Sequence, residues 1–256
     1  MNFRKFPIRV LARKRYDQLV LAEKEKIAWA GRFSFLEKFP DPMAGFFLKN
    51  LSRSHAQLHQ DLFILWESKL KRNGYFVEIG ACDGVLFSNT LLLEKEYGWS
   101  GILVEPARCW WDDLKQNRKS IIVHDFISAQ SGGRVLFNEA AHPEFSGAHK
   151  FIRQDHHAEK RAGGREYPVP TLSLGDLLEL RQAPREIDFL SIDVEGGEYE
   201  ILASFDFERY RIHAIFCEHN YTPQRIKIQQ LLAQKGYIRR HESFSQFDDW
   251  YFLKED

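Results

Sequence analysis

Short apolar runs rich in β-branched and aromatic residues recur from residue 75 onwards, and segments with helical spacing separate most of them. Strands are expected at Tyr75–Ile79, Gly101–Glu105, Ser120–Phe126, Arg134–Phe137, Phe189–Ile192, Ala214–Glu218, Tyr237–His241 and Trp250–Leu253. Helices are expected at residues 54–72, 88–97, 171–180 and 222–235, with shorter ones after residues 105 and 197. This alternation predicts an α/β domain with a mostly parallel sheet and helices on both faces.

Two regions depart from this pattern. Residues 13–36 carry apolar side chains at loose helical spacing among many charges, and Pro40 and Pro42 interrupt them. We therefore predict a basic helical N-terminal extension, residues 1–53, and a main domain, residues 54–256. Residues 139–166 are irregular and rich in histidine and glycine. Because these histidines lack metal-ligand spacing, the segment is interpreted as a substrate loop.

Composition limits the class of protein. The chain has 256 residues, of which 44% are hydrophobic and 28% charged, as in a soluble globular protein. No apolar run approaches the length of a membrane span, and the N-terminus has no signal-peptide pattern. Three widely spaced cysteines without a C-x-x-C pair predict reduced thiols, no disulfide and no metal site. A cytoplasmic protein is expected.

Charge is unevenly distributed along the neutral chain. Residues 1–45 hold ten Lys or Arg and five Asp or Glu, a net charge of +5, so the remainder carries −5. The basic and apolar N-terminus is compatible with peripheral contact at the inner face of the membrane, or with an arm packed on the domain. The acidic remainder argues against nucleic acid as a partner.

A glycine loop follows the first strand. Gly80 and Gly84 bracket a turn between the strand and a helix, as in loops that bind nucleotides. Glu78 and Asp83 would repel a pyrophosphate but suit the cationic methionine part of S-adenosylmethionine. The loop from Glu78 to Gly84, including Ala81, is therefore a candidate cofactor site. An ordinary turn with a salt-bridged Glu78 is the alternative.

Acidic residues also follow the second and third strands. Glu105 ends a buried run about 20 residues after the loop, which is the spacing at which an acid meets a ribose diol. Asp125 lies at the end of the third strand, where it would accept the adenine amino proton or cap the next loop. Glu105 and Asp125 complete the candidate nucleoside site.

A second acidic group follows the fourth and fifth strands. Asp193 and Glu195 come after a buried strand and precede the turn Gly196-Gly197. Either acid would serve as a base for an acceptor hydroxyl, and the pair would otherwise bind a divalent cation or cap a helix. Glu218, His219 and Asn220 follow the next strand, and His219 has the unperturbed pKa closest to neutral. The candidate catalytic residues are Asp193, Glu195 and His219, and Asp193 is also a candidate cofactor-binding residue.

Several motifs carry a family resemblance. They are FVEIGACDG with SNT, GWSGILVEP, VPTLSLGDLL, IDFLSIDVEGGEYEIL, FCEHN and DDWYFL. From about Tyr75 onwards the chain resembles the FkbM family of S-adenosylmethionine-dependent methyltransferases. The resemblance implies a Rossmann-like class I methyltransferase fold with a seven-stranded sheet. By motif, the methionine part of the cofactor would be held by Glu78, Gly80 and Gly84, the ribose by Glu105, and the reaction edge would hold Asp193 and Glu195.

The resemblance also implies a reaction. Family members methylate hydroxyl groups, often on sugars of surface glycans or on secondary metabolites, so a small-molecule or glycan acceptor is expected. A protein that binds the cofactor without catalysing transfer is the alternative. A nicotinamide-linked oxidoreductase is disfavoured because the loop lacks the third glycine of the dinucleotide motif.

Overall fold

The computed structural model describes residues 37–149 and 164–254, and the chain divides into two compact units, Met1–Ser52 and Arg53–Asp256. In the first unit, helix α2 (Asp41–Asn50) begins at the two prolines, with Pro42 in its first turn, where a missing N–H costs no helical hydrogen bond. The short 3₁₀ helix η1 (Leu51–Arg53) follows. The expectations for the basic segment fall on residues 1–36 and lie outside the described residues.

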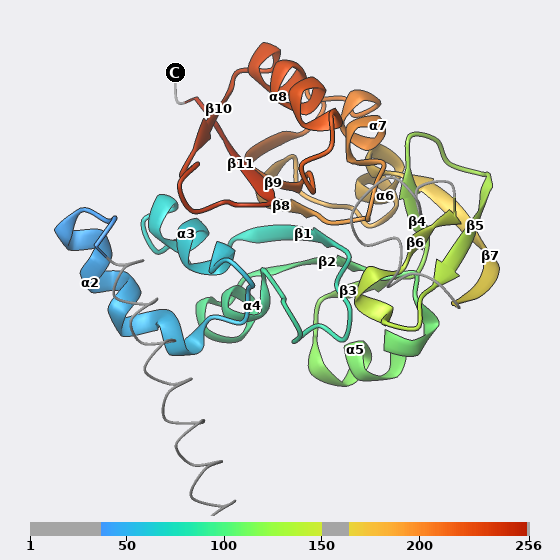
Figure 1. Cartoon of the computed structure of the whole chain (residues 1–256), viewed down its shortest axis with the longest axis horizontal. Helices are drawn as coiled ribbons and strands as arrows, with labels where there is room; N and C mark the ends of the chain where they lie inside the picture. Colours follow the sequence, from blue (N-terminus) through green and yellow to red (C-terminus); the bar gives the residue numbers. More distant parts are fainter. Residues whose placement is uncertain (1–36, 150–163, 255–256) are drawn as a thin grey trace, which may run out of the picture. The chain divides into compact units, whose positions relative to one another are not determined.

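A seven-stranded sheet organises the second unit (Figure 1). Its strands are β1 (Tyr75–Ile79), β2 (Ser100–Val104), β3 (Ile121–Val123), β8 (Glu186–Ile192), β9 (Arg211–Glu218), β10 (Tyr237–Arg240) and β11 (Asp248–Leu253). They lie in the order β10-β11-β9-β8-β1-β2-β3. Only β11 runs antiparallel to its neighbours. Strand order reverses between β1 and β8, and in open α/β sheets the ligand crevice lies at the carboxyl ends of the strands at such a point.

Helices cover both faces of this sheet (Figure 1). One side carries α3 (Gln60–Glu67), α4 (Leu91–Tyr97) and α5 (Trp111–Asn117), and the other carries α6 (Leu174–Leu180), α7 (Glu198–Ala203) and α8 (Gln224–Gln234). On the first side, the Phe63 and Trp250 rings pack 4.5 Å apart. On the second, Leu177 and Leu202 join a buried cluster with Ile192. The predicted α/β fold is confirmed. None of the helices in the described ranges combines the length and apolar content needed to cross a membrane.

A second, four-stranded sheet was not expected. It consists of β4 (Phe126–Ser128), β5 (Arg134–Glu139), β6 (Gly147–Ala148) and β7 (Arg165–Ser173) in the order β4-β7-β5-β6. The strand predicted at Ser120–Phe126 is therefore split between two sheets. β7 was missed because Pro168 and Pro170 lie within it, and proline normally argues against a paired strand. The 3₁₀ helix η2 (Arg108–Trp110) directly precedes α5, and η3 (Pro143–Phe145) lies between β5 and β6.

The predicted substrate loop is only partly described. Between β5 and β7 the structure gives η3 and β6, and β6 pairs with β5. Residues 150–163, which include two of the segment's histidines, lie outside the described residues. The substrate role of residues 139–166 stays a prediction.

Four helices begin later than expected, namely α3, α4, α6 and α8. Before α3 and α4, side chains take the backbone N–H groups of the preceding residues. In the helix predicted at 54–72, Asp61 accepts from the His55 N–H, and His59 has a left-handed backbone, so α3 begins only at Gln60. Before α4, Glu78 accepts from the Asn89 N–H. His55 and His59 therefore do not share a helix face.

Candidate active site

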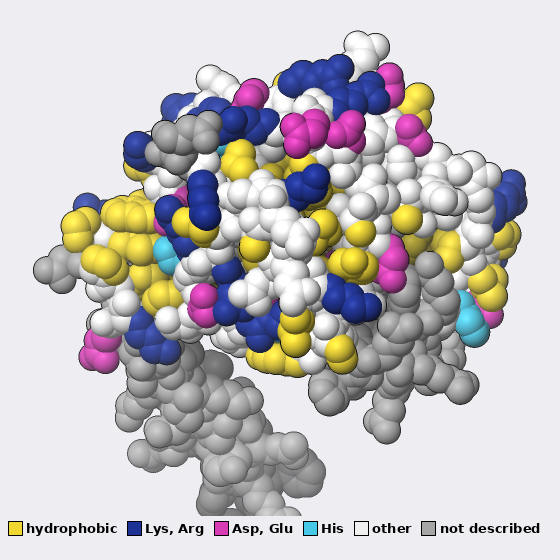
Figure 2. Space-filling view, turned by 90° about the horizontal axis from the view of Figure 1, so that it is seen from above, with side chains coloured by type: hydrophobic (Ala, Val, Ile, Leu, Met, Phe, Trp, Pro, Cys, Tyr) yellow, Lys and Arg dark blue, Asp and Glu magenta, His cyan; other side chains and the backbone are white. Residues whose placement is uncertain are grey.

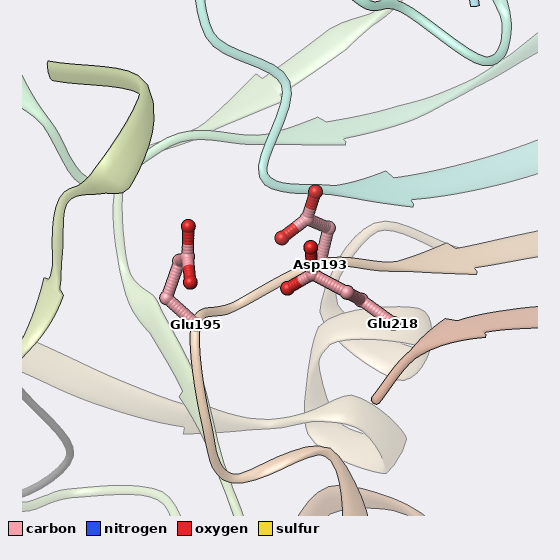
Figure 3. Close-up of side chains that lie close together, drawn as sticks. All are labelled: Asp193, Glu195 and Glu218. Atoms are coloured by element: carbon pink, nitrogen blue, oxygen red, sulfur yellow. The ribbon is translucent and has the colours of Figure 1, made fainter. Parts of the chain in front are cut away.

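Three carboxylates meet at the carboxyl ends of the central strands (Figure 3). Asp193 and Glu195 follow β8, and Glu218 ends the neighbouring strand β9. One oxygen from each lies within 4.8 Å of the others. Parallel pairing of β8 with both β1 and β9 places these strand ends side by side. The predicted position of Asp193 and Glu195 at this edge is confirmed.

Backbone geometry holds the two loops of the site together. Gly80 has φ +93°, and a Cβ there would lie 2.1 Å from the Asp193 carbonyl oxygen. The Asp193 N–H donates to the Ile79 carbonyl at 3.0 Å. Glu195 has φ +57°, an unusual value for a side chain of this size. Gly80 is therefore required for the approach of the β1 and β8 ends.

Burial perturbs the acid–base behaviour of two of these carboxylates. Burial raises the pKa of Asp193 to about 7, with a further contribution from nearby Asp248, while a hydrogen bond with Glu218 acts in the opposite direction. Burial and the Asp193 charge raise the pKa of Glu218 well above its ordinary range. A half-buried, hydrogen-bonded pair of this kind shares a proton near neutral pH.

Two cavities meet at the carboxylates. The smaller, about 50 Å³, is lined by residues that include Glu105, Phe126, Ile127 and Phe137. The larger, about 280 Å³, is lined by residues that include Gln57, Phe87, Asn89, Ser191, Glu218 and Asn220. Gly80, Cys82, Glu144, Asp193 and Glu195 line both. A ligand that extends from one cavity to the other would pass the carboxylate cluster.

Glu105 lies in the smaller cavity, as expected for a ribose-binding acid. Its two carboxylate oxygens accept from the backbone N–H groups of Cys82 at 2.8 Å and Ala107 at 2.7 Å. Burial raises its pKa to about 8. Glu105 thus joins the glycine loop to the end of β2, and its contact with ribose stays a prediction.

The Glu78 carboxylate makes hydrogen bonds within the protein. Its carboxylate, 2% exposed, accepts hydrogen bonds from Ser88 Oγ, the Asn89 N–H and Thr90 Oγ1. The buried Arg118 guanidinium lies 3.6 Å from it. Glu78 therefore orders the segment that leads into α4, and its predicted contact with the methionine part of the cofactor is not tested by this geometry.

The remaining loop residues shape the turn. Asp83 accepts from the backbone N–H groups of Val85 and Leu86 through Oδ1. The Ala81 side chain is buried and its N–H donates to the Val104 carbonyl. At Gly84, φ is +79° and a Cβ would lie 2.5 Å from the Arg118 side chain. These contacts explain the loop conformation, whereas the cofactor contacts predicted for Asp83, Ala81 and Gly84 stay predictions.

Asp125 lies between β3 and β4 and does not line either cavity. The neighbouring His124 stacks on Trp111 at 4.0 Å and contacts the Glu105 carbonyl through Nδ1. The second-sheet residues Phe126 and Ile127 line the smaller cavity instead. The predicted adenine contact of Asp125 therefore gains no support from the cavity lining.

His219 is buried beside a different set of charges. Its Nδ1 accepts from the Tyr221 N–H at 3.0 Å, and its Nε2 lies 3.8 Å from Asp249 Oδ1. Burial lowers its pKa, so the ring is neutral at pH 7. It lines neither cavity. The residue that faces Asp193 is Glu218. The sequence placed Glu218 at the end of the neighbouring strand, but it was not among the predicted catalytic residues.

Fold and site together define the class of protein. A sheet in which only β11 is reversed, with an acidic site at the ends of β1, β8 and β9, has the architecture of a class I methyltransferase. The chain belongs to the FkbM methyltransferase family, since the model described as the Methyltransferase FkbM domain matches residues 78–253.

The comparisons also found individual proteins that are similar to this chain. Methyltransferase sdnD from Sordaria araneosa is 26% identical, over 66% of this chain and 76% of that protein. Among solved structures, a TehB-like SAM-dependent methyltransferase from Corynebacterium glutamicum has a TM-score of 0.39 at 10% identity, covering 84% of this chain and 97% of that one. A human methyltransferase 10 domain containing protein has a TM-score of 0.41 at 15% identity, covering 77% and 83%.

Proposed function

We propose that this protein transfers a methyl group from S-adenosylmethionine to a hydroxyl oxygen of a small-molecule or glycan acceptor. The observation that carries the proposal is the carboxylate cluster Asp193, Glu195 and Glu218 at the junction of two cavities. Membership of the FkbM family supports methyl transfer. Attack by a hydroxyl oxygen requires a group that takes its proton, and a carboxylate with a pKa near neutral is suited to that task.

The lining residues of the two cavities offer polar groups suited to the proposed cofactor. Glu105 in the smaller cavity and the acidic edge of the larger one offer acceptors for hydroxyl and ammonium donors, respectively. When bound, S-adenosylmethionine supplies an electrophilic methyl group on a sulfonium. Glycine loop residues 80–84 and Glu105 would hold it, and the negative charge of Asp193 and Glu195 would favour the cationic cofactor over a neutral product.

Asp193 is the proposed base. Its hydrogen bond with Glu218 stabilises one proton shared by the pair, so that the ionised partner receives the proton of the acceptor hydroxyl. Partial burial of the pair strengthens the local electrostatic interactions. Positioning of the hydroxyl oxygen in line with the methyl–sulfur bond would supply most of the rate enhancement.

The acceptor is proposed to be a sugar or a secondary metabolite. The larger cavity presents Gln57 and Asn220 for hydrogen bonds and Phe87 as an aromatic surface. Its described lining residues include no Lys or Arg. Nucleic acid is not proposed as a partner, and in Figure 2 the basic side chains of the visible face form separate groups with acidic and hydrophobic ones among them.

A divalent cation is the second way in which the cluster would act. Three carboxylate oxygens within 4.8 Å match the preference of hard cations for oxygen ligands, and a bound cation would acidify the acceptor hydroxyl. Assays with EDTA and with added Mg²⁺ separate the two mechanisms. Activity that survives EDTA would mean that Asp193 and Glu218 take the hydroxyl proton without a metal. Activity restored only by Mg²⁺ would mean that a bound cation acidifies the hydroxyl.

The proposed activity is tested with the full chain, S-adenosylmethionine and a panel of neutral sugars, glycosides and polyols, with S-adenosylhomocysteine measured by mass spectrometry. We expect acceptor-dependent S-adenosylhomocysteine, and its loss in an Asp193→Asn variant that still binds the cofactor. Cofactor binding without turnover on any acceptor would support the non-catalytic alternative. Equal turnover by the variant would exclude Asp193 as the base.

A further inference from the structure

Asn89 carries a buried polar atom without a partner. Its backbone N–H donates to Glu78 at 2.7 Å, and its Nδ2 donates to Ser191 Oγ at 2.9 Å. The remaining polar atom of the side chain, Oδ1, is buried and has no hydrogen-bond partner. Buried amide oxygens are normally paired, so an unpaired one at a cavity suggests a ligand that supplies the donor.

The surroundings keep this side chain in place. Glu78 binds the backbone of Asn89 and also accepts from Ser88 and Thr90 on either side of it. Arg118 contacts the same segment through Gly84, Ser88 and Thr90. The Asn89 amide is therefore preorganised before any ligand binds, and Glu78, which also lines the larger cavity, holds the Asn89 backbone.

The acidic lining of the cavity indicates which hydrogen-bond donor of a ligand would contact Asn89 Oδ1. Asn89 lines the larger cavity with five carboxylates, and the described lining includes no Lys or Arg. The carboxylates are those of Glu78, Glu144, Asp193, Glu195 and Glu218. A site with this charge favours a cation. A hydroxyl group would offer one donor and no charge, whereas a primary ammonium offers three N–H donors together with a positive charge.

Resting on the proposed function, we infer that Asn89 binds the α-ammonium group of S-adenosylmethionine, with Oδ1 accepting one of its N–H bonds. Ser191 orients the Asn89 amide, and Glu78 is a positioning residue that holds the Asn89 backbone. The contact with the methionine part thus belongs to Asn89, eleven residues after Glu78 in the sequence.

The test compares two ligands that share the thioadenosine part. S-Adenosylhomocysteine carries the α-amino group, and 5′-deoxy-5′-methylthioadenosine lacks the whole amino-acid part. We expect an Asn89→Leu change in the full chain to weaken S-adenosylhomocysteine binding about 10- to 100-fold, as for a lost hydrogen bond to a charged group. Binding of 5′-deoxy-5′-methylthioadenosine is expected to change less than about twofold. Both are measured by calorimetry.

An Asn89→Asp variant identifies the group that Asn89 contacts. Asp retains an oxygen acceptor, so S-adenosylhomocysteine binding should stay within about threefold of wild type if the partner is the ammonium. A larger loss than in Asn89→Leu would mean that the amide donates to the carboxylate of the amino-acid part, and would overturn the inference. Unchanged binding in Asn89→Leu would also overturn it, as would equal weakening of both ligands.

These outcomes are distinct from failure of the proposed function. If wild-type protein binds neither ligand, the proposed cofactor is wrong and the inference falls with it. If wild type binds both equally and Asn89→Leu leaves both unchanged, the cofactor assignment stands and only the role of Asn89 is rejected. Thermal unfolding of each variant confirms that the compared proteins are folded.

Discussion

Single carboxyl groups determine how the site responds to pH. Asp193 has a pKa of about 7 because of burial, and it shares a hydrogen bond with Glu218. If this pair takes the acceptor proton, methyl transfer should increase as pH rises from 5.5 to 8, with an apparent pKa near 7 that belongs to the pair. The measurement is kcat/KM against pH. A rate that is flat across this range would contradict the assignment.

The same group should lower stability at high pH. Its pKa rises from 3.8 to about 7 on folding, so its favourable contribution is complete below pH 4 and is lost as pH rises through 7. Asp193→Asn should therefore gain several degrees in Tm over wild type at pH 8, since about 2–4 °C corresponds to each kcal/mol in a domain of this size. The difference should be smaller at pH 5. A constant difference would mean that Asp193 is ionised throughout.

Sequence patterns predicted where the site residues lie better than they predicted which residues form hydrogen bonds and ion pairs with them. Asp193 and Glu195 were expected at a strand end because buried runs precede them, and both lie there. The internal use of Glu78 depends on Ser88, Thr90 and on Arg118 forty residues later, which no local pattern shows. Likewise, a buried His219 could not be distinguished from an exposed one without knowing how Asp249 packs.

At the scale of elements, the contact between the β1 and β8 ends depends on one glycine. Gly80→Ala would bring a methyl group to 2.1 Å from the Asp193 carbonyl, and we expect a loss of more than about 2 kcal/mol in unfolding free energy and loss of cofactor binding. Urea denaturation and calorimetry measure these effects. Gly175→Ala in α6 is the matched control, because a Cβ there meets nothing within 4 Å and alanine favours a helix by about 0.5–1 kcal/mol. Similar losses in both variants would refute the steric explanation.

The segment leading into α4 depends on a buried ion pair. Arg118 has a fully buried side chain that bonds Glu94 at 3.1 Å and lies 3.6 Å from Glu78. Arg118→Met should cost about 3–5 kcal/mol because it leaves buried carboxylates without their cation. The exposed pair of Arg209 and Glu179 provides the control, and Arg209→Met should leave the unfolding free energy almost unchanged. Equal costs in chemical denaturation would argue against a structural role for Arg118.

Strands made of apolar runs were predicted from the sequence, whereas the strand that contains prolines, β7, was not. β1, β2, β8 and β9 are nearly continuous apolar runs, as expected for buried parallel strands. β7 alternates prolines with buried Tyr167 and Val169, so its sequence reads as a loop. Its pairing with β5 stabilises it through contacts that are remote in sequence.

At the scale of the whole molecule, the division into two units predicts that the second unit folds by itself. A chain of residues 53–256 contains both sheets and α3, whose Gln60 donates to Asp248 at 2.9 Å. We expect it to unfold cooperatively and to bind S-adenosylhomocysteine. A chain starting at residue 75 lacks α3 and leaves Asp248 and the Trp250 ring uncovered, so it should be insoluble or unfold at much lower denaturant concentration. Equal stability of the two fragments, or failure of the longer one to fold, would contradict this boundary.

The seven-stranded architecture was predicted from the family resemblance, since apolar runs alone do not specify which strands are neighbours. Right-handed parallel crossovers and short connections limit the choices, but the reversal of β11 has no local signal. The second sheet also depends on long-range pairing, for example of Phe137 with Tyr167. Family and local pattern together predicted the main sheet and left the four-stranded one unrecognised.

The placement of β11 has a consequence for synthesis on the ribosome. This strand follows β10 in sequence but lies between β9 and β10, so the sheet keeps a gap until residue 253 has left the exit tunnel. Until then, β9 and β10 each present an unpaired edge, which invites pairing with other chains. A premature stop a few codons before the end of β11 would therefore release a product in which β9 and β10 stay unpaired on one edge. Chaperones and proteases act on products of this kind.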